Sequence, residues 1–215
     1  MKNALLFGGG SKWGASLTKT LINNNYHIDL ISSSNFEHSN VDVYSIDWND
    51  CSEQKLNDII NNLKTEKYDL IFFNQNSGGG PNDIYFSPDN DFPLEYWNSA
   101  FWVNSQLTYY AVKRLTNKIT DHTKIGWMLT GLINGKDPEF WKFAGYASVK
   151  STNLHLMRGF AKYHPGIFFC IQPIWFPQGE EEKDANSILN TIEGLDIEDS
   201  GKTFNKDGTI WDLTQ

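Results

Sequence analysis

The sequence has few of the residues on which several classes of protein depend. Its two cysteines, Cys51 and Cys170, have no metal-ligand spacing, and its five histidines form no HxxxH or HExxH motif, so zinc catalysis has no support. Only two arginines and a net charge of −8 disfavour nucleic acid and anionic membranes as partners. No apolar run reaches membrane-spanning length, and residues 4–7 are too few for a signal peptide. We therefore expect a protein of the reducing cytoplasm.

The order of the apolar segments predicts an α/β fold. A chain of 215 residues with 40% hydrophobic and 20% charged residues is typical of one globular domain. Short apolar runs alternate with longer stretches at helical spacing, which is the pattern of βαβ units in a parallel sheet. The predicted strands are residues 4–7, 27–31, 41–46, 69–73, 124–130 and 167–172. Helices are predicted around Leu17 and Leu21, after Ser52, and over residues 93–115, 141–163 and 185–192, with an acidic loop at 180–182.

A glycine-rich turn joins the first strand to the first helix. The run Gly8-Gly9-Gly10-Ser11-Lys12-Trp13-Gly14 lets the backbone approach a pyrophosphate, and the helix start supplies free N–H groups and a positive dipole end. A plain tight turn is the alternative, but a strand, three glycines and a helix in succession favour nucleotide binding. A Walker phosphate loop is excluded, because Lys12 is followed by Trp13 rather than Ser or Thr.

Two tyrosine–lysine pairs have the spacing that places a phenol and an ammonium on one face of a helix. They are Tyr146 with Lys150 and Tyr109 with Lys113. A tyrosine beside a cation can act as a general acid or base, since the cation lowers its pKa from about 10 toward the working range. The spacing also arises by chance, so the surrounding order must decide. It favours Tyr146, because no strand and hydroxyl loop precede Tyr109, which is interpreted as a helix-surface residue.

The order of these motifs resembles that of the classical short-chain dehydrogenase/reductase family over nearly the whole chain. The family opens with Thr-Gly-x-x-x-Gly-x-Gly, of which Gly8 and Gly14 match the first and last glycines, with Lys12 in the middle position. A second register uses Gly10, Gly14 and Ser16, and both registers stay open. The later matches are Asp47 after the third strand, Gln75-Asn76-Ser77-Gly78 for the Asn-Asn-Ala-Gly loop, Asn104 in the central helix, Tyr146 and Lys150 for Tyr-x-x-x-Lys, and Pro173 after the sixth strand.

The resemblance implies a Rossmann-type, doubly wound parallel sheet in a single domain, residues 1–215. It implies an NAD(P)(H)-dependent oxidoreductase that interconverts a carbonyl and an alcohol by hydride transfer, with Tyr146 as general acid/base. Lys150 would bind the nicotinamide ribose and lower the tyrosine pKa, and Asn104 would hold a water that links Lys150 to solvent. The implied cofactor-binding residues are Gly8, Gly10, Ser11, Lys12, Gly14, Ser32, Ser33, Asp47, Asn76, Gly78, Tyr146, Lys150 and Pro173. Taken alone, Asp47 could close a turn and Asn76 could satisfy loop backbone.

The chain departs from the family pattern where the substrate carbonyl would bind. The family places a serine thirteen residues before the tyrosine, and this chain has Ile133 there. Thr130 lies near that serine region and can donate the same hydroxyl hydrogen bond, so it is the expected catalytic hydroxyl. Asn134 is another donor. The family's threonine shortly after Pro173 is also absent.

Cofactor and substrate preferences rest on a few further residues. The run Ser32-Ser33-Ser34 after the second strand has no carboxylate to repel a 2′-phosphate, and Lys12 could attract one, so NADP(H) is favoured over NAD(H). Trp175 and Phe176 follow a strand end, where they could wall a pocket for a small carbonyl or alcohol. Family members usually form dimers or tetramers through the helices of Asn104 and Tyr146, so we expect a homodimer or homotetramer.

A second hypothesis is a relative that binds the dinucleotide but is catalytically weak or inactive, and serves as a regulatory or assembly subunit. The missing serine and the irregular glycine loop motivate this hypothesis. The presence of Asn104, Tyr146 and Lys150 argues against it, because binding alone needs no proton relay. A sugar-nucleotide epimerase of the extended relatives is disfavoured, since such chains need a larger carboxyl-terminal region.

Overall fold

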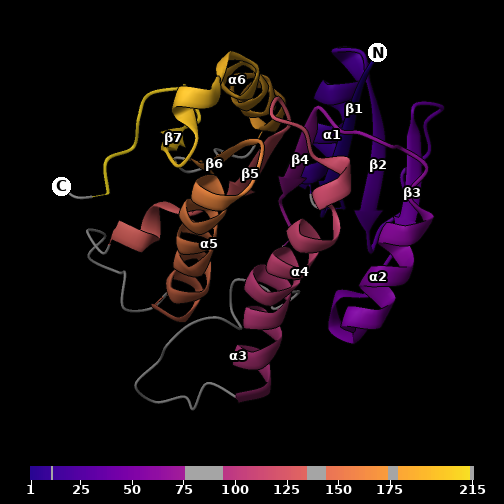
Figure 1. The fold of residues 1–215 in the computed structure, drawn as a ribbon, viewed down its shortest axis with the longest axis horizontal. Coiled ribbons are helices and arrows are strands. Elements are labelled where there is room, and N and C mark those ends of the chain that lie inside the picture. Colours follow the sequence, from indigo (N-terminus) through magenta and orange to yellow (C-terminus); the bar gives the residue numbers. More distant parts are fainter. Residues whose placement is uncertain (11, 76–93, 135–143, 174–178, 214–215) are drawn as a thin grey trace.

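Seven strands of the described residues form one parallel sheet with helices on both faces (Figure 1). The computed structural model describes residues 1–10, 12–75, 94–134, 144–173 and 179–213. The strands are β1 Lys2–Phe7, β2 Tyr26–Ser32, β3 Val41–Ser45, β4 Leu70–Phe73, β5 Lys124–Met128, β6 Ile167–Gln172 and β7 Thr203–Asn205. Their order across the sheet is β3-β2-β1-β4-β5-β6-β7, and every neighbouring pair is parallel.

The chain winds outward from the middle of this sheet in both directions. It passes from β1 through β2 to β3 on one side and from β4 through to β7 on the other. Strands β1 and β4 are therefore direct neighbours at the point where the strand order reverses. This is the doubly wound, Rossmann-type arrangement that the sequence predicts. In such sheets the ligand crevice lies outside the carboxyl ends of the strands at the reversal point.

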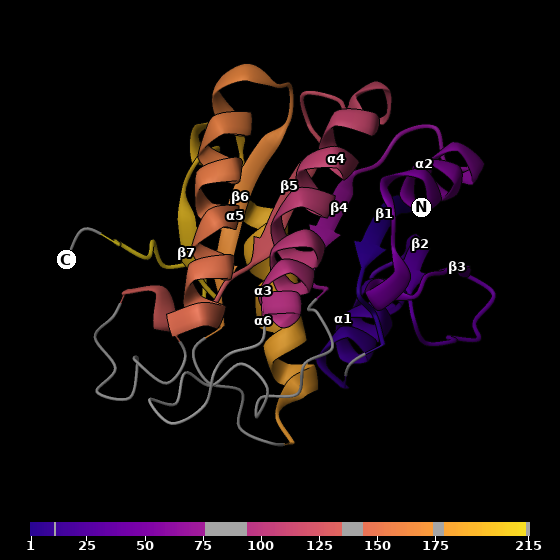
Figure 2. The same cartoon turned by 90° about the horizontal axis from the view of Figure 1, so that it is seen from below.

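The helices are divided between the two faces of the sheet. Helices α1 (Lys12–Asn23) and α6 (Glu181–Gly194) contribute to the core on one face, and α2 (Glu53–Asn62), α4 (Leu107–Arg114) and α5 (Ala144–Tyr163) contribute to the core on the other. Helix α3 (Leu94–Phe101) continues into α4 through a π-helix, Trp102–Gln106. This continuous helix runs beside α5 (Figure 2). Within the described residues, none of the helices is long and apolar enough to cross a membrane.

The alternation of side chains along each strand produces the two cores. Leu5 and Phe7 of β1 belong to the core of α2, α4 and α5, whereas Ala4 and Leu6 belong to the core of α1 and α6. Successive residues of a strand face opposite sides of the sheet, so a strand covered on both sides needs an unbroken apolar sequence. This requirement explains why the strands were visible in the sequence as short apolar runs.

Several element boundaries differ from the sequence predictions for physical reasons. The acidic loop predicted at 180–182 is wrong, because Glu181 and Glu182 form the first turn of α6, where carboxylates are stabilised by the positive end of the helix dipole. The short edge strand β7 was not predicted. The predicted helix after Ser52 is confirmed, and the Ser52 hydroxyl accepts the Lys55 N–H at 3.2 Å as its N-cap.

Candidate active site

The candidate active site lies at the carboxyl ends of β1 and β4. Gly8 follows β1 with φ at +84°, a conformation that residues with a Cβ rarely adopt. Its N–H donates to the Ile31 carbonyl at 2.9 Å, and its carbonyl accepts the side-chain N–H of Asn74 at 2.9 Å. A Cβ on Gly8 would lie 2.5 Å from the Cα of Gln75. The ends of β1 and β4 are therefore in direct backbone contact, which only glycine permits here.

The described part of the glycine loop is packed against both the start of α1 and the end of β2. A Cβ on Gly14 would lie 2.5 Å from the carbonyl oxygen of Gly8, and a Cβ on Gly10 would lie 2.4 Å from the hydroxyl of Ser34. Helix α1 begins at Lys12, and the first N–H groups of a helix are free to bind an anion. Ser11 lies outside the described residues, so both glycine registers remain open.

The residues expected to bind the adenosine half of the cofactor lie at the carboxyl ends of β2 and β3. Ser32 is buried, and its hydroxyl accepts the N–H of Ser34 at 3.1 Å, while Ser33 is exposed. The N–H of Ile46 donates to the Ser32 carbonyl at 3.1 Å. Asp47 follows and is exposed at this edge. Ser32 therefore lies next to Gly10, and Asp47 follows the neighbouring strand β3 at the same end of the sheet.

Lys150 is a buried, positively charged residue of the candidate site. Its side chain is only 3% exposed on α5, and its Nζ donates to the backbone carbonyl of Gln75 at 3.5 Å. The same Nζ lies 5.8 Å from the centroid of the half-buried Tyr146 ring, one helical turn away. The phenol and the ammonium thus share one face of α5, as their spacing predicts, and that face meets the end of β4.

Burial shifts the pKa of both groups. It lowers the pKa of Lys150 to about 8, because the charged ammonium is removed from water. It raises the pKa of Tyr146 to about 12, since the phenolate is the charged form of a phenol. The pKa of Tyr146 is therefore raised, whereas the sequence predicted that it would be lowered. The Lys150 ammonium, 5.8 Å from the ring centroid, does not offset the effect of burying the phenol.

Gln75, which accepts a hydrogen bond from Lys150, is also bonded to the π-helix that contains Asn104. Asn104 is buried in the π-helix, where its Nδ2 donates to the Ala100 carbonyl at 3.0 Å and its Oδ1 has no partner among the described residues. Gln75 is also buried, and its Nε2 donates to the Val103 carbonyl at 3.1 Å. Its Oε1 likewise lacks a partner within the described part of the chain. Gln75 therefore bridges Lys150 and the π-helix through its own backbone and side chain.

Sequence reasoning did not assign Gln75 to the site. It stands at the first position of the stretch that resembles Asn-Asn-Ala-Gly, and that position was the available signal. The two motif residues that were assigned, Asn76 and Gly78, lie outside the described residues. So do Trp175 and Phe176, the expected substrate wall.

Thr130 and Pro173 lie at the carboxyl ends of neighbouring strands. Thr130 is half-buried just after β5 and precedes a 3₁₀ turn, Gly131–Asn134, that contacts α5. Pro173 is half-buried directly after β6. A Cβ on Gly131 would lie 2.6 Å from the side-chain nitrogen Nε2 of Gln172, so the segments that follow these two strands are close. Both residues are thus at the carboxyl end of the sheet, where Gly8 and Gln75 also lie.

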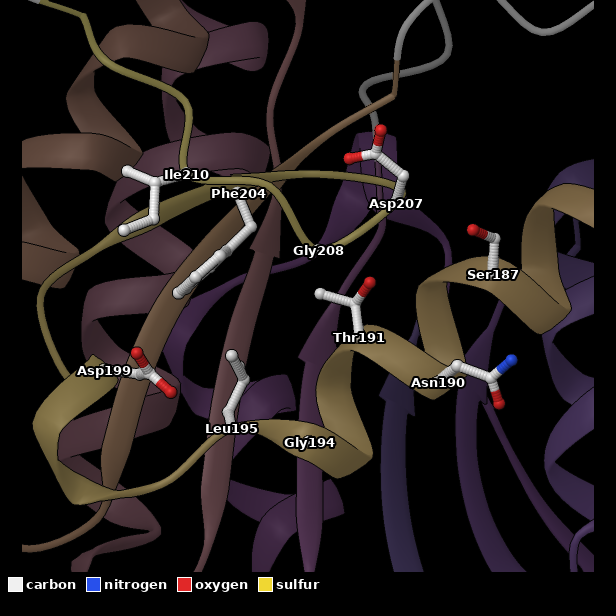
Figure 3. Close-up of a pocket in the computed structure, with 10 residues that line it drawn as sticks. All are labelled: Ser187, Asn190, Thr191, Gly194, Leu195, Asp199, Phe204, Asp207, Gly208 and Ile210. Carbon is white, nitrogen blue, oxygen red and sulfur yellow. The ribbon is translucent and has the colours of Figure 1, made fainter.

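The rival pair on α4 is remote from this arrangement. Tyr109 is 44% exposed, and its ring stacks on Phe160 of α5 with centroids 5.8 Å apart. A hollow near the carboxyl terminus is also separate from the candidate site (Figure 3). It lies between α6 and the segment that follows β7, and the hydroxyls of Ser187 and Thr191 both donate to the Lys206 carbonyl there, at 2.9 and 3.1 Å. The hydroxyls of Ser187 and Thr191 are therefore already engaged in hydrogen bonds that hold α6 to the segment after β7.

Comparison with known proteins identifies the fold. No protein-family model matches the sequence, and no curated protein matches it. A short-chain dehydrogenase/reductase from Serratia marcescens has a TM-score of 0.74 and 16% identity, covering 97% of this chain and 98% of that one. A carbonyl reductase from Pseudomonas aeruginosa has a TM-score of 0.78 and 13% identity, covering 98% and 99%. A short chain dehydrogenase family protein from Francisella tularensis has a TM-score of 0.68 and 16% identity, covering 96% and 87%.

The chain therefore has the fold of the short-chain dehydrogenases/reductases, as the resemblance predicts. The likeness extends over nearly the full length of both chains in each comparison. At 13% and 16% identity it establishes the fold, while the reaction has to be argued from the residues of this chain.

Proposed function

We propose that this protein is an oxidoreductase of the short-chain dehydrogenase/reductase type that interconverts a small carbonyl compound and its alcohol. One observation carries the proposal: a buried lysine, Lys150, shares a helix face with Tyr146 and reaches the backbone carbonyl of Gln75 at the end of β4. Burying an ammonium is costly, and a purely structural helix face would use an apolar residue there. Perturbed titratable groups at a ligand crevice are typical of catalytic sites.

The residues at the sheet edge fit a nicotinamide dinucleotide. Gly8, Gly10 and Gly14 keep side chains away from the start of α1, where a pyrophosphate would be held. Ser32, Ser33 and Asp47 would hold the adenosine half. The side-chain oxygens of Asn104 and Gln75 have no hydrogen-bond partner within the described part of the chain, so they could accept hydrogen bonds near the end of β4. When bound, the dinucleotide supplies or accepts the hydride in such enzymes.

Side chains of the protein would transfer the proton and stabilise the charges that form during the reaction. In reduction, the phenol of Tyr146 donates its proton to the substrate oxygen, and in oxidation the phenolate accepts one. Lys150, with its pKa lowered to about 8, is largely cationic at pH 7, and its charge would offset part of the cost of burying the phenolate. Its ammonium would also hold the ribose of the dinucleotide, and Asn104 Oδ1 would accept a hydrogen bond from a water that links Lys150 to solvent. Thr130 polarises the carbonyl from the end of β5.

We favour NADP(H) over NAD(H). The end of β2 has three serines and no carboxylate, so a 2′-phosphate meets no repulsion there. Ser32 and Ser34 lie against Gly10, which leaves room for small hydroxyls rather than a long acidic side chain. Thermal shift with NADPH and NADH tests this preference directly, because the tighter ligand raises the midpoint more at equal concentration.

A catalytically weak or inactive dinucleotide-binding subunit is the second candidate. Ile133 at the family's serine position and the raised pKa of Tyr146 are the observations that favour it. Binding without turnover is its expected behaviour.

A panel of carbonyl compounds, with the loss of NADPH absorbance as the readout, separates the two candidates. Aliphatic, aromatic, sugar and acyl carbonyls would be offered to protein whose NADPH binding has been verified by thermal shift. Turnover of any one of them supports the enzyme, and the substrate class follows from the best. Binding of NADPH without turnover across the panel would favour the inactive subunit, and absence of binding of either dinucleotide would reject both.

We also propose that the chain acts in the cytoplasm as a homodimer or homotetramer joined through the helices of Asn104 and Tyr146. Tyr109 and Tyr163 expose large aromatic surface on this side of α4 and α5. Light scattering measures the mass in solution. A Tyr163→Glu variant is expected to shift it toward the monomer.

A further inference from the structure

Three side chains with metal-binding atoms converge on the edge of the sheet, at strands β2 and β3. His27 and Asp29 are two residues apart on β2, so they point to the same face. Asp42 of β3 is the direct register partner of Asp29 in the parallel ladder. One ligand atom from each of these three residues lies within 4.8 Å of the other two.

Asp29 differs from the other two residues because its carboxylate is buried and is not part of the ion pair between His27 and Asp42. Its side chain is 0% exposed, in the middle of β2. Its Oδ2 accepts a hydrogen bond from the Tyr68 hydroxyl at 2.5 Å, while its Oδ1 has no hydrogen-bond partner among the described residues. A buried carboxylate oxygen left without a partner costs free energy, so a buried site of this kind is normally completed by a cation or a donor.

The separation of the other two ligands suits a small metal ion. His27 Nε2 lies 3.3 Å from Asp42 Oδ2. Two ligands held at about 2.0 Å by a tetrahedral zinc ion are about 3.3 Å apart, so this edge of the site has the required spacing. The Asp29 oxygen, within 4.8 Å of both, needs a movement on the order of 1 Å to complete the set.

The residues around the cluster provide a hydrogen-bond donor to one ligand and a route to solvent. The Tyr68 hydroxyl that binds Asp29 would orient that carboxylate, as second-shell donors do in metal sites. Lys64 Nζ lies 3.5 Å from Asp42 Oδ1, but its side chain is 77% exposed and can move into solvent. Asp42 and His27 are themselves partly exposed, with side-chain values of 37% and 25%, so an ion can enter from the surface.

We propose that His27, Asp29 and Asp42 bind a divalent transition-metal ion of the Zn²⁺ type, with water in the remaining position. One imidazole and two carboxylates are ligands for such ions, whereas Mg²⁺ and Ca²⁺ prefer oxygen alone. The ion neutralises the two carboxylates and ties the edge strand β3 to β2, so its expected role is structural. The site faces away from Ser32, three residues or about 10 Å further along β2, and stands independently of the proposed reaction.

Titration of the EDTA-treated full chain with ZnCl₂ tests the site, with calorimetry and thermal unfolding as readouts. We expect saturable binding of one ion per chain and a rise in the midpoint of about 5 °C or more at saturating metal. His27→Gln and Asp42→Asn each remove one ligand at a partly exposed position, so both are expected to fold. Each should weaken Zn²⁺ binding by about 100-fold or more. MgCl₂ at the same concentrations should give a much smaller shift.

His122→Gln is the matched control, because His122 is an exposed histidine outside the cluster. It should bind Zn²⁺ as the unmodified chain does. Cobalt(II) gives an independent readout, since its visible absorption bands report an ordered nitrogen–oxygen site and should disappear in His27→Gln. Absence of stoichiometric binding, equal loss in His122→Gln, or an equal response to Mg²⁺ would each overturn the proposal.

Discussion

The Nζ of Lys150 lies 5.8 Å from the centroid of the Tyr146 ring and donates at 3.5 Å to the backbone carbonyl of Gln75, at the end of β4. This relationship joins a helix face to the reversal point of the sheet. The spacing of the two residues fixes only that they share a face of α5. The tertiary fold decides that this face, rather than that of Tyr109 and Lys113, meets the carboxyl end of β4.

Replacement of Tyr146 by phenylalanine should abolish proton transfer and leave the fold intact. The ring is half-buried and its shape is preserved, so the midpoint of thermal unfolding should change little. Loss of the general acid should lower kcat by about 100-fold or more. Initial rates with the best substrate of the carbonyl panel measure this effect.

Tyr109→Phe is the matched control for that measurement. Tyr109 begins the other tyrosine–lysine pair, is 44% exposed and lies on α4. Its rate should equal that of the unmodified chain. If the two phenylalanine variants have similar rates, Tyr146 is not the general acid.

Replacement of Lys150 by methionine should stabilise the protein at neutral pH. The pKa of Lys150 is lowered from its ordinary 10.5 to about 8, so the unfolded state binds this proton more tightly than the folded state. The cost is fully present below pH 8 and disappears as the pH rises through 10.5. Lys150→Met should therefore raise the free energy of unfolding by about 2 to 3 kcal/mol at pH 7, and the gain should shrink toward pH 10.5.

Urea unfolding at several pH values measures the difference between the two proteins. Lys162→Met, at an exposed position of the same helix, should show no such pH-dependent difference. A gain that stays constant from pH 7 to pH 10.5 would mean that packing, rather than the buried charge, is responsible.

The fold was largely predictable because its signals are local. Strands covered on both faces need unbroken apolar runs, and the runs at 4–7, 69–73 and 167–172 are easily recognised. The start of α2 was marked by the Ser52 cap. Strand β7 was missed because three residues at an edge carry almost no periodic signal. The π-helix at Trp102–Gln106 is a change of hydrogen-bond register that residue types do not reveal.

The sequence allowed candidate site residues to be named, but not their environment. The order of motifs favours Tyr146 over Tyr109 as the candidate general acid, and that assignment remains a prediction. The direction of the tyrosine pKa was not predictable, because it depends on burial that only the folded chain defines. Gln75 was overlooked for the same reason, since its bridging role arises from one side-chain contact and one backbone contact to sequence-distant residues.

Replacement of Gly14 by alanine should destabilise the glycine loop, although alanine is the better helix former. The added Cβ would lie 2.5 Å from the Gly8 carbonyl oxygen and 2.9 Å from the Gly9 Cα, and backbone atoms cannot yield as flexible side chains do. We expect a loss of about 2 kcal/mol in the free energy of unfolding and weaker binding of NADPH. Gly159→Ala on α5 is the control, because nothing lies within 4 Å of its added Cβ. It should gain about 0.5 to 1 kcal/mol, so the two variants should differ in sign.

Replacement of Lys206 by methionine should weaken the attachment of α6 to the turn after β7. Lys206 Nζ lies 2.6 Å from Asp184 Oδ1, and the Asp184 side chain is buried at the start of α6. Removing the lysine leaves a buried carboxylate without its cation, which should cost about 2 to 3 kcal/mol in urea unfolding at pH 7. Lys183→Met removes an exposed pair with Glu180 in the same turn of the helix and should cost less than about 1 kcal/mol. Equal losses in the two variants would show that the burial of Asp184 does not make its ion pair stronger than a surface one.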